Sequence, residues 1–275
     1  MNAKAIGRKL NTLALTDPLE AGKRIFNLFR SPVRRAIVGA EQAFLATAEE
    51  RDTLRIATHD IATYRWGKAK PSVDVLLLHG WESNSARWRW LMPHLREAGY
   101  TVAAIDAPAH GNSSGAAFDI PRYGEAVATA IAHFMPRAVV GHSMGGVCLS
   151  YALTHHTLPV PERIVIMGTP SDLRFMIEGF ARVLGLQEVA LRGLDAYFEQ
   201  VMERTIDYFS VAAFSERIEV PTLVLHDEGD PTAPVGDARR YARALPNGRL
   251  HITHGLGHSL QGNDAYRAIL DFLSA

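Results

Sequence analysis

A serine in a glycine-rich turn is the side chain of this sequence best placed to act as a nucleophile. Ser143 is the middle residue of Gly-His-Ser-Met-Gly, residues 141–145, which follows the apolar run 138–140 and precedes a helical pattern. A sharp turn from strand to helix strains the backbone of its middle residue and leaves room only for small neighbours. The helix amino terminus favours a developing oxyanion. The pattern predicts acyl-transfer chemistry at Ser143, and its alternative is an inert serine in a tight turn.

A serine nucleophile needs a base, and the base needs a carboxylate that orients it. Asp227 and Asp230 both follow one apolar run, and His258 follows the strand pattern at 251–253. The carboxyl ends of parallel strands meet at one edge of a sheet, where open α/β sheets bind their ligands. We therefore expect a carboxylate and a histidine from these segments to lie beside Ser143.

Backbone amides near this turn could stabilise the oxyanion. The segment His-Gly-Trp at 79–81 follows the apolar run 73–78, and Gly80 permits close approach of the backbone to a substrate. One amide of such a loop and the amide after the nucleophile can together hold an oxyanion. The sequence predicts this role for the backbone N–H groups of Trp81 and Met144, while the ring of Trp81 packs against its surroundings.

These side chains need a scaffold that brings distant segments to one edge. From residue 54 onward, short apolar runs alternate with helical patterns, which predicts right-handed crossovers and a mostly parallel sheet. We expect an α/β fold, a doubly wound sheet of about eight strands with helices on both faces. The interval at about 170–218 breaks the alternation. Its short amphipathic patterns predict a helical cap inserted between two strands.

Five motifs stand in order along the chain: HGW (79–81), IDAPAHGNS (105–113), GHSMGG (141–146), DEGDPTAP (227–234) and GLGHS (255–259). In these motifs the sequence resembles the α/β-hydrolase superfamily, over about residues 54–275, and in particular its serine esterases and lipases with a helical cap. The resemblance implies that Ser143 is the nucleophile, Asp230 the acid and His258 the base, that the insertion covers the active site, and that no cofactor is needed. The dehalogenase and epoxide-hydrolase branches, which resemble this fold, use aspartate at the turn, and the serine disfavours them.

The predicted activity is that of a serine hydrolase, which cleaves carboxylic ester bonds of small to medium apolar substrates through an acyl-enzyme. The same triad could serve a thioesterase, a lactonase, a carbon–carbon hydrolase, a perhydrolase or an acyltransferase. A ligand-binding protein of this fold that has lost turnover is a further alternative, because fold alone does not fix function. The intact set of serine, acid and histidine argues against it.

The insertion is rich in apolar and aromatic side chains. Most of them are expected to pack the cap, but a lid must also present an apolar surface to a substrate. The candidate substrate-binding residues are Phe175, Phe180, Phe198 and Met202. Acidic and basic side chains are mixed along the insertion, which predicts a neutral acyl group rather than phosphate or coenzyme A.

Other residues that could do chemistry have simpler explanations. His251, His254 and His258 have a spacing that could suggest a metal site. Residues three apart in a strand point to opposite faces, however, and no carboxylate or cysteine completes an obvious site. We therefore expect no metal ion. Asp106 and His110 are expected to order the loop in which they lie.

The composition excludes several classes of protein. The 29 basic and 29 acidic side chains give a net charge of zero, which argues against a nucleic-acid binder. The single cysteine, Cys148, excludes an internal disulfide and fits a cytoplasmic location. No apolar run reaches the roughly 18 residues of a membrane span, and no secretory-signal pattern is evident. A small ester-type molecule is the expected partner.

Residues 1–53 are predicted to form a basic, helical N-terminal extension outside these motifs. Residues 1–35 carry eight basic and two acidic side chains, and Ile25, Leu28 and Phe29 recur at helical spacing. One interpretation is a helix that binds a membrane surface or a partner. The favoured interpretation is a solvated helix packed across the main domain, because the apolar face is short. The role of this region and the oligomeric state stay open.

Overall fold

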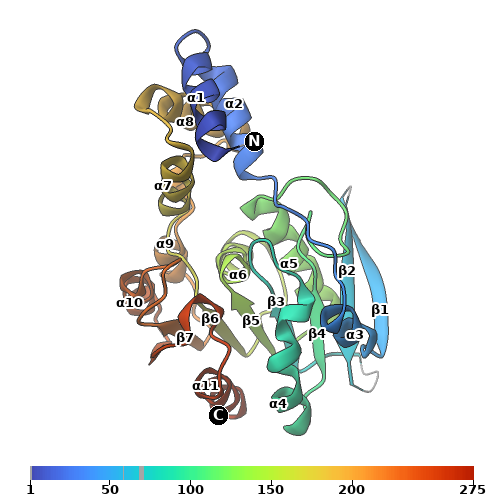
Figure 1. Cartoon of the computed structure of the whole chain (residues 1–275). Helices are drawn as coiled ribbons and strands as arrows, with labels where there is room; N and C mark the ends of the chain where they lie inside the picture. Colours follow the sequence, from blue (N-terminus) through green and yellow to red (C-terminus); the bar gives the residue numbers. More distant parts are fainter. Residues whose placement is uncertain (1, 58, 68–70) are drawn as a thin grey trace. The chain divides into compact units, whose positions relative to one another are not determined.

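The computed structural model describes residues 2–57, 59–67 and 71–275, which form two compact units (Figure 1). The larger, the sheet unit, comprises Pro32–Ser171 and Val211–Ala275. The smaller, the helical unit, comprises Met1–Ser31 and Asp172–Ser210. Within the described ranges, no helix is both long enough and apolar enough to cross a membrane.

One sheet of eight strands forms the centre of the sheet unit. The strands are β1 (Glu50–Ile56), β2 (His59–Trp66), β3 (Val75–Leu78), β4 (Val102–Ile105), β5 (Ala138–His142), β6 (Arg163–Met167), β7 (Thr222–Asp227) and β8 (Gly248–Thr253). Their order is β1-β2-β4-β3-β5-β6-β7-β8, and all neighbours run parallel except the pairs β1–β2 and β2–β4. The predicted fold class, a mostly parallel sheet of about eight strands, is confirmed.

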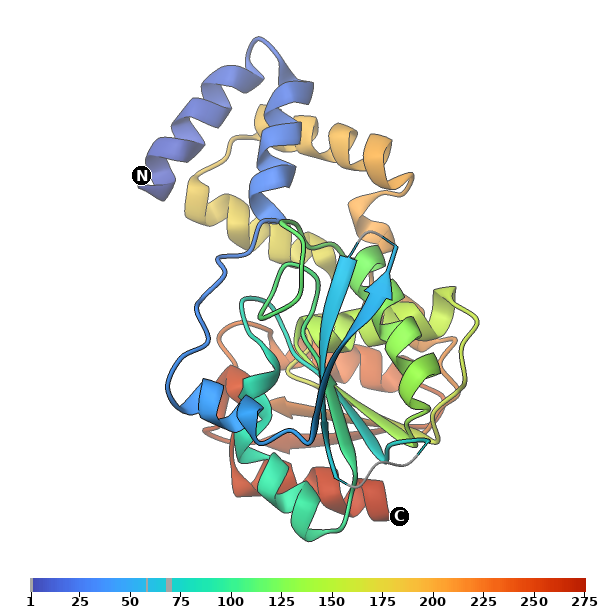
Figure 2. The same ribbon diagram turned by 90° about the vertical axis from the view of Figure 1, so that its right-hand side faces the viewer.

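Helices cover both faces of this sheet (Figure 2). The helices of this unit are α3 (Ala40–Ala46), η1 (Ser85–Trp90), α4 (Met92–Glu97), α5 (Ile120–Phe134), α6 (Met144–His155), α9 (Val211–Ser215), α10 (Val235–Ala244), η3 (Gly257–Ser259) and α11 (Asn263–Ser274). Side chains of α3, η1, α4 and α11 pack on the face that carries Val75 and Leu77. Because side chains alternate along a strand, Leu76 and Leu78 point to the other face.

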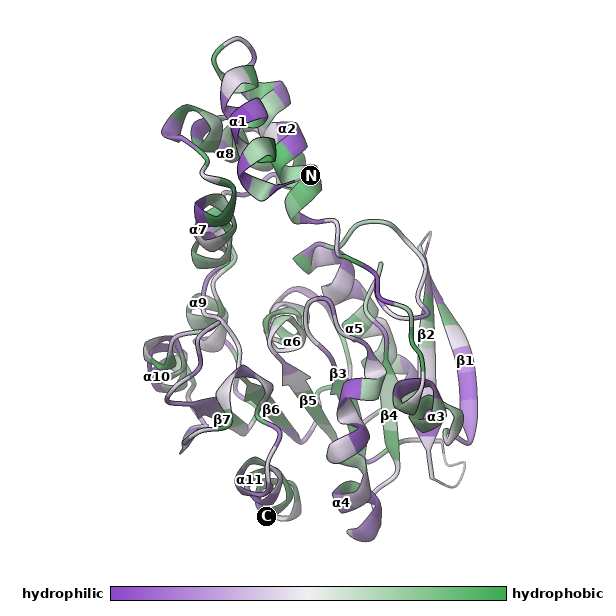
Figure 3. Cartoon of the chain, viewed as in Figure 1, coloured by the Kyte–Doolittle hydropathy of each residue, from purple (hydrophilic) through white to green (hydrophobic). Residues whose placement is uncertain are grey.

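Burial on both faces explains the continuous apolar runs in the sequence. All four residues of β3 and all four of β4 are buried, whereas most of the edge strand β1 is exposed. Figure 3 shows the same contrast between apolar central strands and a largely hydrophilic β1.

The parallel register brings the ends of the central strands to one edge. Leu78 at the end of β3 pairs with Ile105 of β4 and with Gly141 of β5. His142 of β5 pairs in turn with Met167 at the end of β6. The loops that follow these strands therefore start side by side, although their residues are far apart in the sequence.

The helical unit joins the N-terminal helices with the helices of the insertion. It contains α1 (Ala3–Ala14), α2 (Pro18–Phe29), α7 (Leu173–Leu184), α8 (Glu188–Met202) and η2 (Ile206–Tyr208). The ring of Phe26 on α2 meets that of Phe198 on α8 edge-on, with centroids 5.4 Å apart. Asn11 on α1 donates to the Gly185 carbonyl and accepts from the Gln187 amide, both at 2.9 Å. The buried Asn11 thus secures the turn between α7 and α8.

This grouping differs from the division that the sequence predicts. The sequence predicts residues 1–53 as one extension and about 170–218 as a separate cap, whereas residues 1–31 pack on the insertion and 32–53 belong to the sheet unit. Together, residues 1–31 and 172–210 hold ten basic and nine acidic side chains. The basic excess of the N-terminal helices is therefore offset by the acidic excess of the insertion within one unit.

Two glycines allow α2 and α8 to cross in backbone contact. A Cβ atom on Gly193 would lie 2.0 Å from the Pro18 carbonyl oxygen, and one on Gly22 would lie 2.0 Å from the Gly193 carbonyl oxygen. We expect Gly193→Ala to lower the free energy of unfolding by about 1–3 kcal/mol, the usual cost of overpacking. Urea denaturation followed by circular dichroism measures the change.

Gly179 on α7 provides the control for this prediction. A Cβ atom there would meet nothing nearer than 3.8 Å, the distance to a terminal nitrogen of Arg182. Gly179→Ala should leave stability unchanged or raise it by about 0.5–1 kcal/mol, since alanine is the better helix former. Equal effects of the two substitutions would show that the close crossing does not limit stability.

Candidate functional site

Ser143 occupies a strained turn between β5 and α6. Its φ of 53° and ψ of −120° lie in a region that residues other than glycine rarely adopt. Its amide donates to the Met167 carbonyl at 2.9 Å. A Cβ atom on Gly145 would lie 2.4 Å from the Leu78 carbonyl oxygen, so only glycine fits there. The small residues beside Ser143 are required because this strand–helix turn, the elbow, lies directly against the end of β3.

The structure brings Ser143, His258 and Asp230 together. The Oγ atom of Ser143 lies 3.1 Å from Nε2 of His258, and Nδ1 of His258 lies 2.8 Å from Oδ2 of Asp230. An ionised carboxylate can only accept, so Nδ1 of His258 carries the proton and Nε2 offers its lone pair to Ser143. Ser143 follows β5, Asp230 follows β7 and His258 follows β8. The three side chains therefore come from widely separated parts of the chain.

Asp230 is held as a carboxylate. Its Oδ1 accepts hydrogen bonds from the amides of Thr232 at 2.7 Å and Ala233 at 3.0 Å. Burial raises the pKa of Asp230, but the hydrogen bonds from His258 and from these amides outweigh burial and hold the pKa below its ordinary value. Asp230 is therefore charged at neutral pH and fixes the orientation of the imidazole.

Asp227, the second candidate for the acid, has a different set of partners. It accepts from the hydroxyl of Thr253 and the amide of Leu256, both at 2.9 Å, and from the amide of Gly229 at 3.0 Å. Burial raises the pKa of Asp227, but these hydrogen bonds outweigh burial and hold the pKa below its ordinary value. Asp227 thus ties the loop before His258 to the end of β7, while Asp230 is the carboxylate that reaches the imidazole.

The loop after β3 lies against the elbow. A Cβ atom on Gly80 would lie 2.8 Å from Cβ of Ser143. The amide of Met144 is at the amino terminus of α6, where helix amides lack partners within the helix. Among the described residues, neither this amide nor that of Trp81 donates a hydrogen bond to the protein. The ring of Trp81 packs edge-on against Phe118, with centroids 5.4 Å apart.

Comparison with known proteins identifies the family. The sequence profile described as the alpha/beta hydrolase family matches residues 75–272. The chain belongs to this family. The family predicted from the five motifs is thereby confirmed, and the protein is a hydrolase.

Relatives of this hydrolase resemble it over most of their length. A non-heme haloperoxidase of Rhodococcus erythropolis is 25% identical over 257 residues, covering 76% of this chain and 93% of the relative. The bifunctional esterase/perhydrolase DCH of Acinetobacter calcoaceticus is 24% identical over 268 residues, covering 78% and 95%. The crystal structure of bromoperoxidase from Bacillus anthracis superposes with a TM-score of 0.64 at 18% identity, covering 82% of this chain and 100% of that one. This last likeness shows the shared fold.

In the hydrolase, the loop after β4 supports the loop that carries Trp81. Asp106 is fully buried and accepts from the amide and the hydroxyl of Ser85, both at 2.7 Å. Nε2 of His110 accepts from the amide of Glu82 at 3.0 Å, and Nδ1 of His110 donates to Pro108 at 2.9 Å. The predicted loop-ordering role of Asp106 and His110 agrees with these contacts.

Buried neutral histidines make the stability of the hydrolase depend on pH. Burial lowers the pKa values of His79 and His110 from 6.5 to about 4. The unfolded chain therefore binds more protons than the folded one between these values, and stability present above about pH 6.5 is lost as the pH falls toward 4. Near the middle of this window, each histidine should change the free energy of unfolding by about 1.4 kcal/mol per pH unit.

His110→Gln tests this dependence. Glutamine has no proton to gain, but its carbonyl oxygen can still accept from the Glu82 amide. Urea denaturation between pH 6.5 and 4 should show a slope that is smaller by about 1.4 kcal/mol per pH unit in the variant. Parallel curves for the two proteins would mean that His110 titrates normally in the fold.

Two residues before the sheet contribute contacts that the sequence analysis did not anticipate. The amide of Val33 donates to Oε1 of Glu82 at 2.9 Å, and Arg34 donates to the carbonyl of Ser113 at 2.6 Å. Glu82 adopts a φ of 47° directly after Trp81. No periodic pattern marks an extended segment of this kind, and only its arginine and proline residues distinguish it in the sequence.

The four candidate substrate-binding residues lie in the helical unit. Phe198 is 1% exposed and packs edge-on against Phe26 and Phe209, which favours the alternative that it packs the unit. The ring of Phe180 packs edge-on against that of Phe29, with centroids 5.4 Å apart. Phe175 and Met202 are partly exposed and stay candidates.

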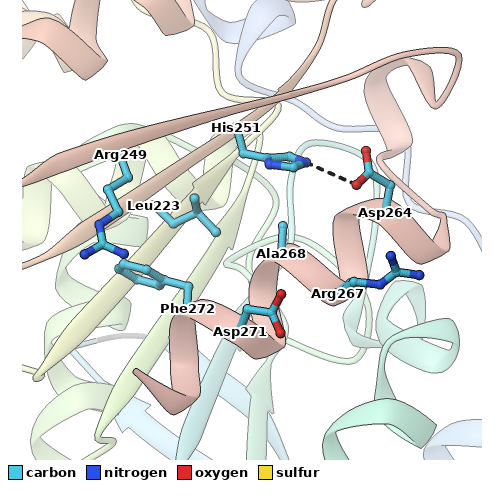
Figure 4. Close-up of a pocket in the computed structure, with 8 residues that line it drawn as sticks. All are labelled: Leu223, Arg249, His251, Asp264, Arg267, Ala268, Asp271 and Phe272. Atoms are coloured by element: carbon cyan, nitrogen blue, oxygen red, sulfur yellow. Dashed lines mark hydrogen bonds and ion pairs between the residues drawn. The ribbon is translucent and has the colours of Figure 1, made fainter.

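The three histidines near the C-terminus face three different carboxylates. His251 is 3.2 Å from Asp264, His254 is 3.1 Å from Glu228, and His258 contacts Asp230. Figure 4 shows His251 turned toward Asp264 in a surface pocket of about 260 Å³ between β8 and α11. Of the three, only His258 lies at Ser143.

Proposed function

We propose that this hydrolase is a carboxylesterase that acts on small to medium apolar esters through an acyl-enzyme on Ser143. The observation that carries the proposal is the hydrogen-bonded chain from Ser143 through His258 to Asp230, set on a strained strand–helix turn. Strain is retained at positions where the surrounding structure enforces it, and such positions cluster at active sites.

In the first half of the reaction, His258 takes the proton of Ser143 as Oγ attacks the ester carbonyl carbon. The carbonyl oxygen becomes an oxyanion that accepts hydrogen bonds from the amides of Trp81 and Met144. The carbon–oxygen bond to the alcohol then breaks, and the protonated His258 gives its proton to the departing alkoxide. Alcohol leaves, and the acyl group stays on Ser143.

In the second half, water attacks the acyl-enzyme and gives one proton to His258. The same amides stabilise the second oxyanion, which collapses as the bond to Ser143 breaks. The proton returns from His258 to Oγ, and the carboxylic acid leaves. Asp230 keeps the proton of His258 on Nδ1 and stabilises the imidazolium that forms in each half. No step draws on a cofactor.

The substrate class is proposed as neutral and apolar. The insertion mixes acidic and basic side chains and offers no cluster that would grip phosphate or coenzyme A. The name of the bifunctional esterase/perhydrolase relative supports ester cleavage. It also supports perhydrolysis as a second candidate, in which hydrogen peroxide replaces water in the second half and a peracid leaves. Thioesters and lactones would pass through the same acyl-enzyme.

A fluorophosphonate and a panel of p-nitrophenyl esters test the proposal on the purified full chain. The fluorophosphonate should modify Ser143, as mass spectrometry of the digested protein will show. The ester panel should give a kcat/KM that rises about fourfold for each added methylene, from about 0.8 kcal/mol of burial each, and then falls. Modification of another serine, or a preference for charged acyl groups, would contradict the proposal.

A further inference from the structure

His142, the residue before Ser143, holds the main chain of the expected base. Its Nε2 lies 2.8 Å from the His258 carbonyl oxygen, which can only accept, so Nε2 carries the proton. His142 is 6% exposed, and its ring lies 5.0 Å from the ring of His258, centroid to centroid. This side chain reaches across to the segment that follows β8, a contact that no motif of the sequence predicts.

His226 makes a similar contact on the acid side. It is fully buried on β7, and its Nε2 lies 2.8 Å from the Ala233 carbonyl oxygen. The same nitrogen is 3.6 Å from Oδ2 of Asp230. His226 thus holds the carbonyl of Ala233, and the amides of Thr232 and Ala233 in the same segment donate to Oδ1 of Asp230.

Both histidines keep this contact at a cost. Among the residues that the structure describes, Nδ1 of His142 and Nδ1 of His226 are buried without a hydrogen-bond partner. An unsatisfied buried polar atom costs about 1–3 kcal/mol. An apolar side chain of similar shape would avoid this cost, so packing alone does not account for a histidine at either position.

We propose that His142 and His226 are positioning residues, which hold the loops of His258 and Asp230 by donating from Nε2 to main-chain carbonyls. This inference rests on the proposed function, since it assigns the two histidines a purpose only if Ser143, His258 and Asp230 react together. Neither histidine touches the reacting atoms.

The ring of His142 packs closely against two glycines. A Cβ atom on Gly168 would lie 3.4 Å from Nε2, and one on Gly80 would lie 3.3 Å from Nδ1. The base itself lies in a loop with Gly255 and Gly257, both at positive φ, which can adopt other conformations without side-chain strain. A displacement of reacting groups by 1 Å can cost about 100-fold in rate. The hydrogen bond from His142 to the His258 carbonyl therefore helps to fix the distance from Nε2 of His258 to Oγ of Ser143.

The test compares three substitutions of His142 in the full chain. Leucine removes the donor, glutamine places an amide nitrogen near the position of Nε2, and asparagine places it near Nδ1 instead. The measurements are kcat and KM for p-nitrophenyl acetate, the rate of Ser143 modification by a fluorophosphonate, and the free energy of unfolding in urea.

We expect His142→Leu to lower kcat and the modification rate by about 10–100-fold, with KM and stability nearly unchanged. His142→Gln should restore most of both rates, and His142→Asn should not. His251→Leu is the matched control, because His251 is hydrogen-bonded to Asp264 and lies away from Ser143. It should leave both rates unchanged.

The outcomes separate this inference from the proposed function. Absence of modification at Ser143 in the unsubstituted protein overturns the proposed function itself. Modification of Ser143 at equal rates in the unsubstituted protein and His142→Leu overturns the positioning role alone. If His142→Leu does not fold, the comparison of His142→Gln with His142→Asn decides, and equal rates for these two variants overturn the inference.

Discussion

Ser143→Ala is expected to abolish ester turnover while the fold stays intact. Removing the nucleophile of a serine triad lowers kcat by about 10⁶-fold, because the remaining groups cannot form the acyl-enzyme. The backbone contact from the Ser143 amide to the Met167 carbonyl does not involve the hydroxyl and should persist in the variant. Steady-state hydrolysis of p-nitrophenyl acetate and urea denaturation measure the two properties separately.

Ser150→Ala serves as the matched control. Ser150 is also buried on α6, where its hydroxyl donates to the Gly146 carbonyl one turn away. The loss of this hydrogen bond should cost about 1 kcal/mol of stability and leave kcat within a few fold. Substantial turnover in Ser143→Ala, or a large loss of turnover in Ser150→Ala, would mean that another residue forms the acyl-enzyme.

Local signals in the sequence suffice for the elbow and the strands beside it. The residues around Ser143 carry their own evidence: an apolar run that ends in glycine, a serine, and two further glycines. Close packing explains each of these small residues, since Gly145 touches the end of β3 and a Cβ atom on Gly146 would lie 2.1 Å from the Thr169 hydroxyl. A constraint of this kind acts over a few residues and is therefore visible in the sequence.

Contacts between distant segments leave weaker signals. The N-terminal helices and the insertion form one unit. In the sequence, each of these two segments shows only an amphipathic pattern, and such a pattern does not specify which segment packs against it. Gly22 and Gly193, which lie where α2 and α8 cross, are the clearest sequence signal of this contact. A glycine within a helical pattern, however, more often indicates only a less stable helix. The favoured interpretation, a helix packed across the main domain, did not anticipate this pairing.

Hydrogen bonds between segments at the sheet edge are the hardest to anticipate. The contact of His142 with the His258 carbonyl depends on how the end of β5 and the segment after β8, 116 residues apart, meet at the sheet edge. Periodicity and propensity describe single elements and carry no information about such a meeting. The choice between Asp227 and Asp230 is of the same type, because both carboxylates follow β7 and only the path of the loop decides which one reaches the imidazole.

Asp230→Asn is expected to lower kcat by about 10⁴-fold, and Asp227→Asn is expected to act mainly on stability. An amide at Asp230 presents a donor to His258, which favours the tautomer with the proton on Nε2, and Nε2 can then no longer accept the proton of Ser143. Geometry supports this assignment, because Oδ2 of Asp230 is 2.8 Å from Nδ1 of His258. The measurement is kcat for p-nitrophenyl acetate across a range of pH.

Asp227→Asn removes a charge from a carboxylate that anchors the loop before His258. The amides of Leu256 and Gly229 would lose a charged acceptor, so the free energy of unfolding should fall by about 1–3 kcal/mol. The imidazole keeps its own carboxylate, and kcat should fall far less than in Asp230→Asn. A larger loss of kcat in Asp227→Asn, with Asp230→Asn nearly unaffected, would move the acid to Asp227. Small losses in both variants would show that a carboxylate outside this loop orients His258.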